Sequence, residues 1–236
     1  MSRPLTSRLA RSESAMKTTR ATYDSYLRTL RKNRPQVEPI LRRAMDAFDA
    51  IRNRKRVTDA LLRVIVEAAS DPHRPCYEIA TDFLDKLTRN YGPAREAVEK
   101  MATDPRQHVR FNAILCIAES APRPFQLRLL RQGLRDKSSR VRWKAADWAG
   151  RLRLADLVPE LEDAFAAEKN SRARSTIEFN LRLLRDGYIL VPELDGSVEV
   201  TTFCKNGIVS GWFQEREIRK RGIRAIVARL ASKAIS

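Results

Sequence analysis

One short segment carries several side chains that could bind a partner. Trp143 and Asp147 are four residues apart, so a helix would present them on one face. Lys144 and Arg151 lie beside them in the sequence. Clustered cations attract anionic partners, whereas tryptophans at helical spacing more often pack between helices. Which of these roles applies depends on the elements that position the segment.

No other pattern in the sequence indicates chemistry. None of the 8 glycines is arranged as a phosphate-binding G-x4-GK loop. His73 and His108 lack the spacing of a metal-binding pair, and no serine or cysteine has the context of a nucleophile elbow. We therefore expect no catalytic residue, no metal and no cofactor.

A repeated pattern explains how the Trp143 segment is positioned. Copies of it begin at Asp104, Asp136 and Glu168, 32 residues apart, and a fainter copy begins at Asp71. Each copy starts with an acidic residue that suits a helix-capping turn and continues with apolar residues at helical spacing. Second helices are expected between the copies, over 93–102, 124–134 and 155–167. A fixed period of this size predicts stacked helix pairs.

The D-x4-VR-x2-A pattern resembles the HEAT-repeat family of armadillo-like α-solenoids. The match is good at 104–119 and 136–151, fair at 168–184 and weak at 71–87. The resemblance implies a right-handed α-solenoid of antiparallel helix pairs, in which the turn acid and the arginine form a ladder between adjacent repeats. By position, the ladder consists of Asp104, Arg110, Asp136, Arg142, Glu168 and Arg174. We interpret it as structural.

The regions on either side of the repeats differ in character. Residues 1–20 are rich in Ser, Thr and Arg and are predicted to be a disordered basic N-terminus. The helical repeats are predicted over 21–186, with N-terminal helices at about 21–32, 36–52 and 56–69. Residues 187–236 are predicted to form a C-terminal cap.

The cap is predicted to be a small three-stranded β meander followed by a helix. The strands are expected at Tyr188–Val191, Ser197–Cys204 and Ile208–Phe213, and one helix is expected at about 214–233. Asp195-Gly196 and Asn206-Gly207 are typical of two-residue hairpin loops.

Composition limits the partners and the location. The net charge is +17, with 15 basic against 5 acidic residues in 1–56 and 12 against 4 in 104–153. Such clusters favour an acidic partner. The chain has no apolar run long enough to cross a membrane and no signal-type apolar core at its start. Its three cysteines are far apart, so we predict a reducing, cytoplasmic location.

These observations predict a non-catalytic scaffold that binds an acidic protein on the concave face of the solenoid. The residues expected on that face are Asn112, Lys144, Asp147, Arg151, Thr176 and Asn180. The alternative is a nucleic-acid-binding protein that contacts phosphates through Arg and Lys. One form of it follows from a second resemblance: HEAT-like alkylpurine DNA glycosylases also place a Trp and a carboxylate four apart on a solenoid helix. That resemblance implies Asp147 and Trp143 as catalytic and pocket residues.

Overall fold

The computed structural model describes residues 23–205 and 207–233, which form two compact units, 1–101 and 102–236. The predicted disordered segment 1–20 lies outside the described residues. The first unit contains a helix over 23–33, followed by α2 (Glu38–Arg54), α3 (Asp59–Ala69), α4 (Arg74–Thr88) and α5 (Gly92–Met101). The three predicted N-terminal helices are thus present, with bounds shifted by up to three residues.

Aromatic and aliphatic packing holds the first unit together. The Phe48 and Phe83 rings stack with their centroids 4.4 Å apart, and the Tyr23 ring meets Phe83 edge-on at 5.5 Å. Leu41 and Ile65 are fully buried in the same unit. The Thr58 side chain accepts a hydrogen bond from the Leu61 amide and so caps the start of α3.

We expect Glu38 to make the stability of the first unit depend on pH. Its carboxylate accepts hydrogen bonds from Arg42 Nε at 3.0 Å and from Arg31 Nη2 at 3.2 Å. The Arg42 hydrogen bond, with help from Arg31, holds the pKa of Glu38 below its ordinary value, although burial opposes this. A lowered pKa contributes stability above the unfolded value of about 4.3, and this contribution is lost as the pH falls through the folded value.

Glu38→Gln is therefore expected to lower the free energy of unfolding by about 1 kcal/mol near neutral pH. The difference from the wild type should shrink as the pH falls below the ordinary glutamate pKa. Urea denaturation followed by circular dichroism at neutral and acidic pH measures this. Glu78→Gln is the control, because Glu78 pairs with Arg74 at an exposed site and should matter little at either pH. A pH-independent loss at Glu38 would contradict the assignment.

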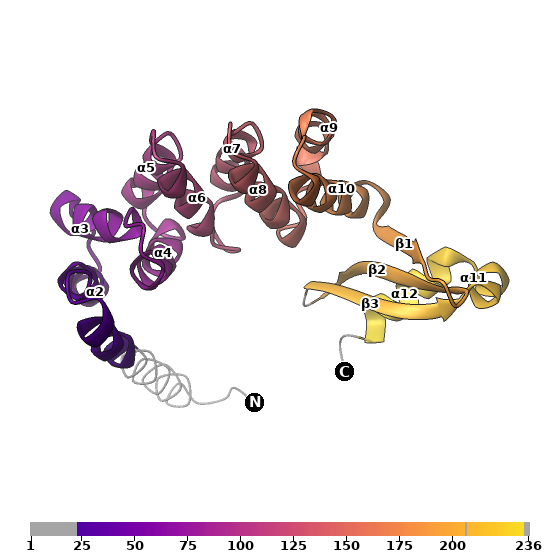
Figure 1. Cartoon of the computed structure of the whole chain (residues 1–236), viewed down its shortest axis with the longest axis horizontal. Coiled ribbons are helices and arrows are strands. Elements are labelled where there is room, and N and C mark those ends of the chain that lie inside the picture. The colour runs from indigo at the N-terminus through magenta and orange to yellow at the C-terminus, as the bar shows by residue number, and fades with distance from the viewer. Residues whose placement is uncertain (1–22, 206, 234–236) are drawn as a thin grey trace, which may run out of the picture. The chain divides into compact units, whose positions relative to one another are not determined.

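The second unit begins with two layers of helices (Figure 1). One layer contains α6 (Gln107–Leu115), α8 (Ser139–Arg151) and α10 (Ser171–Asp186). The other contains α7 (Arg123–Leu134) and α9 (Val158–Ala167), which follows a short 3-10 turn, Ala155–Leu157. Each helix of the second layer packs against a helix of the first, α7 on α8 and α9 on α10. The fold is mostly helical, as predicted for a HEAT-like solenoid.

The C-terminal part of this unit is a three-stranded antiparallel sheet covered by a helix. Strands β1 (Tyr188–Pro192), β2 (Ser197–Cys204) and β3 (Gly207–Gln214) lie in the order β1-β2-β3. Figure 1 shows α12 (Ile223–Lys233) crossing behind the sheet. Its buried side chains, Ile226 and Leu230, pack on Val200. The predicted meander and covering helix are confirmed.

Three details of the cap differ from expectation. Only Gly196 of the Asp195-Gly196 pair has positive φ, and Glu193 N donates to Ser197 O at 2.8 Å, so the loop spans three residues. Cys204 pairs with Gly207, which puts Gly207 in β3, while residue 206 lies outside the described residues. The single helix expected at 214–233 is two helices, α11 (Glu215–Arg221) and α12, because Gly222 has φ 77°.

Arg153 ties the cap to the repeat helices. It follows α8 in a left-handed conformation, with φ 52°. Its guanidinium donates hydrogen bonds to the carbonyls of Cys204 and Gly207 and lies 5.0 Å from the ring centroid of Phe203. The loop after α8 is therefore bonded to the β2–β3 hairpin. No helix in the described part of the chain is long and apolar enough to cross a membrane.

Candidate functional site: the α6, α8 and α10 face

Two of the repeat arginines form ion pairs between neighbouring repeats. Arg110 Nε and Nη2 donate to the two oxygens of Asp136 at 2.7 and 3.0 Å, and Arg142 Nε donates to Glu168 at 2.7 Å. The Arg110 and Asp136 side chains are each 7% exposed. The Asp136 hydrogen bond raises the pKa of Arg110 further above its already high value. The hydrogen-bonding groups of these side chains are therefore already used within the stack of repeats.

The ends of this ladder differ from its middle. Asp104 pairs with Arg106, and this hydrogen bond lowers the pKa of Asp104. Arg174 donates to the carbonyls of Phe165 and Glu168, and its guanidinium lies 4.0 Å from the Phe165 ring centroid. The structure thus brings together two of the predicted inter-repeat pairs, and the outer residues bond within their own repeat.

A second set of repeat contacts lies on the α6, α8 and α10 face. The Arg140 guanidinium carbon is 4.2 Å from the Phe111 ring centroid, and that of Arg172 is 5.8 Å from the Trp143 centroid. Each arginine begins one repeat helix and covers an aromatic ring of the repeat before it. Both arginines are exposed, and neither forms an ion pair with another residue in the described ranges. Sequence reasoning missed this set, although both partners recur at the 32-residue interval.

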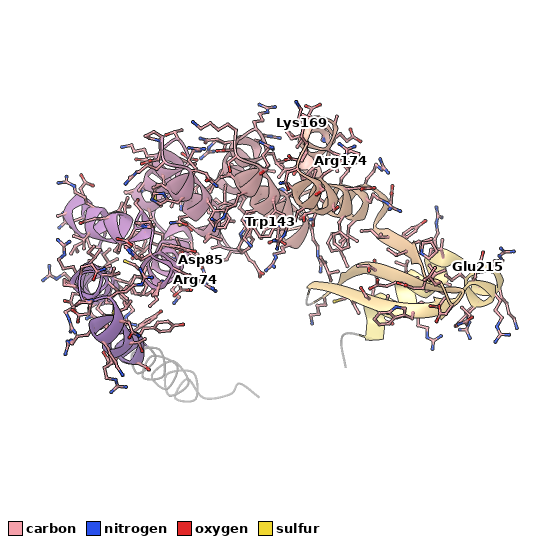
Figure 2. All side chains as sticks on the ribbon, in the orientation of Figure 1. Arg74, Asp85, Trp143, Lys169, Arg174 and Glu215 are labelled. Carbon is pink, nitrogen blue, oxygen red and sulfur yellow. The ribbon has the colours of Figure 1, made fainter. Side chains whose placement is uncertain are left out.

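Trp143, labelled in Figure 2, belongs to a compact charged cluster on α8. Lys144 Nζ and Arg151 Nε contact the two oxygens of Asp147 at 2.8 and 3.1 Å. Lys144 Nζ also lies 5.5 Å from the Trp143 ring centroid and 5.8 Å from that of Trp148. The predicted grouping of these residues on one helix face is therefore present. The Arg151 side chain, at 56% exposed, is the most accessible cation of the cluster.

This geometry bears on the catalytic alternative. Trp143 and Asp147 share a face, as the glycosylase resemblance requires. Both carboxylate oxygens of Asp147, however, already accept from cations on the same helix. An acid committed in this way provides little uncompensated negative charge for a cationic transition state. Asp147 is instead placed to hold the Lys144 ammonium and the Arg151 guanidinium in position through these two hydrogen bonds. Among the described residues, no group of His, Cys, Asp and Glu could hold a metal ion.

Two predicted contact residues are misplaced. Asn112 is 1% exposed and Asn180 is 4% exposed, so neither can touch a partner directly. Asn180 lies under Gly150 of α8 and donates to the Thr176 carbonyl at 2.9 Å. Thr176 is partly buried and donates to the Arg172 carbonyl. The exposed cations of this face are therefore Arg140, Arg151 and Arg172, and Lys144 is partly buried beside them.

A second cationic surface lies along the turns of this unit. A groove of about 690 Å³ is lined there by Asp104, Asp136 and several cations. Its exposed cations outside the ladder include Arg135 and Lys137. They carry the same kind of charge as the α8 cluster but have no aromatic partner within the described residues. Substitution of Arg135 and Lys137 is therefore a matched control for substitutions on the α6, α8 and α10 face.

Comparison with known proteins identifies the repeats. A family model described as HEAT repeats matches residues 94–182, which include the copies beginning at Asp104 and Asp136 and most of the copy beginning at Glu168. No curated protein matches the chain. HEAT repeats suggest a protein-interaction scaffold. The resemblance predicted from the 32-residue pattern is confirmed over residues 94–182, which match the model of HEAT repeats.

Proposed function

We propose that this protein is a non-catalytic scaffold whose α6, α8 and α10 face binds an acidic segment of another protein. The observation that carries the proposal is the pair of exposed arginines, Arg140 and Arg172, seated on aromatic rings of the preceding repeat. Stacking on an aromatic ring restrains a guanidinium without using its N–H donors. These donors are therefore available to bind a carboxylate of the partner.

The local charge supports an anionic partner. Arg140, Arg172, Lys144 and Arg151 contribute four positive charges to this face, and Asp147 offsets one. The guanidinium groups are spaced by the repeat rather than clustered at a point. An extended acidic peptide can contact several of these guanidinium groups in succession. The charges then attract the peptide and also fix its position along the face.

The test measures binding of a fluorescein-labelled oligoglutamate peptide to the full chain by fluorescence anisotropy at low salt. Arg140→Glu/Arg172→Glu is expected to weaken binding at least about tenfold, because two attractive contacts become repulsive. Arg135→Glu/Lys137→Glu makes the same charge change in the groove along the turns and should have a much smaller effect. Equal losses in the two variants, or a larger loss in the control, would contradict the proposed face.

A duplex DNA of the same net charge separates the proposal from phosphate binding. Nucleic-acid binding through several phosphates would fall by roughly a decade or more between about 50 and 200 mM salt. We expect DNA to bind more weakly than oligoglutamate at each salt concentration. Tighter DNA binding that is lost in Arg140→Glu/Arg172→Glu would assign the face to nucleic acid instead.

A further inference from the structure

The outer edge of β3 is an unprotected sheet edge. Among the described residues, β3 pairs only with β2 and has no neighbour on its other side. Its sequence, Gly207–Gln214, contains no charged residue and no proline, the usual devices against unwanted strand pairing. The opposite edge, β1, ends at Pro192 and packs against α10. Among the strands that the structure describes, β3 is therefore the one whose outer edge offers free backbone groups.

The sheet face away from α12 is apolar beside this edge. Alternate β3 residues are exposed, and Trp212 and Ile208 are 65% and 40% exposed. Val191 and Leu194 add further exposed apolar surface on the β1 side. On the other face, Gly211 lies against the Leu230 side chain of α12. Trp212 is thus a large apolar side chain that is exposed and accessible to a partner.

The charge around Trp212 is negative in an otherwise basic protein. Glu199 is the cross-strand neighbour of both Trp212 and Val191. A groove of about 410 Å³ beside them is lined by Glu193, Leu194, Asp195, Ser197 and Trp212. Within the described ranges, neither Glu193 nor Glu199 forms an ion pair, and hydrogen bonds from Ser197 lower the pKa of Asp195. The three carboxylates therefore present uncompensated negative charge.

We propose that the β3 edge binds an extended basic segment of a partner protein as a fourth strand, with a Lys or Arg over Trp212 and directed at Glu199. An added strand would lie two strand spacings from β2, about 9–10 Å. A long cationic side chain covers most of that distance, and the glutamate side chain covers the rest. The Trp212 ring lies between them and can hold the cation on its face. Backbone pairing supplies affinity, and the aromatic and acidic neighbours select a basic sequence.

The test uses a labelled peptide of alternating valine and arginine and the full-length protein, measured by fluorescence anisotropy. We expect binding that weakens about tenfold in Trp212→Ser and about threefold in Glu199→Gln. Glu162→Gln removes an exposed carboxylate on α9 and should leave the affinity unchanged. Trp212 is largely exposed, so its replacement should not disturb folding.

Backbone methylation of the peptide tests strand addition itself. Methylating alternate amides on one edge of the peptide removes the hydrogen bonds to β3 without changing charge, whereas methylation of the other edge leaves them intact. Loss of binding for one methylated peptide and retention for the other is expected. Equal binding of both, no binding of the parent peptide, or no effect of Trp212→Ser would overturn the proposal. Self-association of the protein that Trp212→Ser abolishes would assign the edge to a second copy and overturn it as well.

Discussion

Arg110→Leu is expected to lower the free energy of unfolding of the second unit by about 3–5 kcal/mol. The substitution leaves the Asp136 carboxylate, 7% exposed, without its bidentate partner. It also removes the donors to the carbonyls of Asp104 and Pro105. All three tryptophans lie in this unit, so urea denaturation followed by tryptophan fluorescence reports its unfolding selectively.

Two variants separate burial from charge. Arg106→Leu breaks the Asp104 pair, in which the arginine is 56% exposed, and should cost at most about 1 kcal/mol. Arg110→Leu/Asp136→Leu removes both buried charges and should recover part of the loss, since a buried pair is often replaceable by apolar residues. A loss below about 1 kcal/mol in Arg110→Leu would show that the inter-repeat pair does not stabilise the stack.

Gly150→Ala should produce the second-largest effect, a destabilisation of about 2–3 kcal/mol by overpacking. A Cβ at Gly150 would lie 1.8 Å from Asn180 Oδ1 and 2.7 Å from its Cγ, so the Asn180 side chain must leave its site between α8 and α10. This cost exceeds the gain in helix propensity, which is about 1 kcal/mol. The same tryptophan-detected urea denaturation measures the change.

Space alone should account for the Gly150 effect. Gly150→Ala/Asn180→Ala shortens the side chain that the new methyl group meets, and we expect it to be more stable than Gly150→Ala. Gly92→Ala at the start of α5 meets only the end of the Arg95 side chain at 3.8 Å and should be neutral or slightly stabilising. If Gly150→Ala changed the free energy of unfolding no more than Gly92→Ala does, the result would contradict the close packing of α8 on α10.

The repeat period made much of the fold predictable. The spacing of Asp136 after Asp104, together with the Val-Arg pair in each copy, indicated the helix pairs, and the resemblance to HEAT repeats implied a ladder that includes Arg110 and Arg142. These features are local and recur, so each copy supports the others. The β meander was equally readable, because Val198 and Val200 alternate with polar residues in one strand.

Details that depend on packing between helices and strands could not be predicted from the sequence. Asn180 shares a helix with exposed residues, and only the approach of Gly150 shows that it is buried. Gly222 interrupts an amphipathic pattern that continues on either side of it, so the sequence indicated one helix. The Arg140–Phe111 and Arg172–Trp143 contacts join different helices, and their shared interval becomes meaningful only once the repeats are seen to stack.

We expect the buried arginines of the repeats to affect stability and the exposed ones to affect the proposed binding. Arg110 and Arg142 are bonded to acids of the next repeat, whereas Arg140 and Arg172 lie on aromatic rings and face solvent. Substitution of the first pair should change unfolding, and substitution of the second pair should change affinity. The two effects can be measured on the same set of variants.

Photocrosslinking tests the proposed binding face most directly. Phe179, 37% exposed on α10, lies 32 residues after Asp147 and occupies the equivalent repeat position. With Phe179→p-benzoylphenylalanine, we expect a covalent adduct with the oligoglutamate peptide. With Ala166→p-benzoylphenylalanine, at an exposed position of α9 in the other layer, we expect none. An adduct at position 166 but not at 179 would contradict the proposed face.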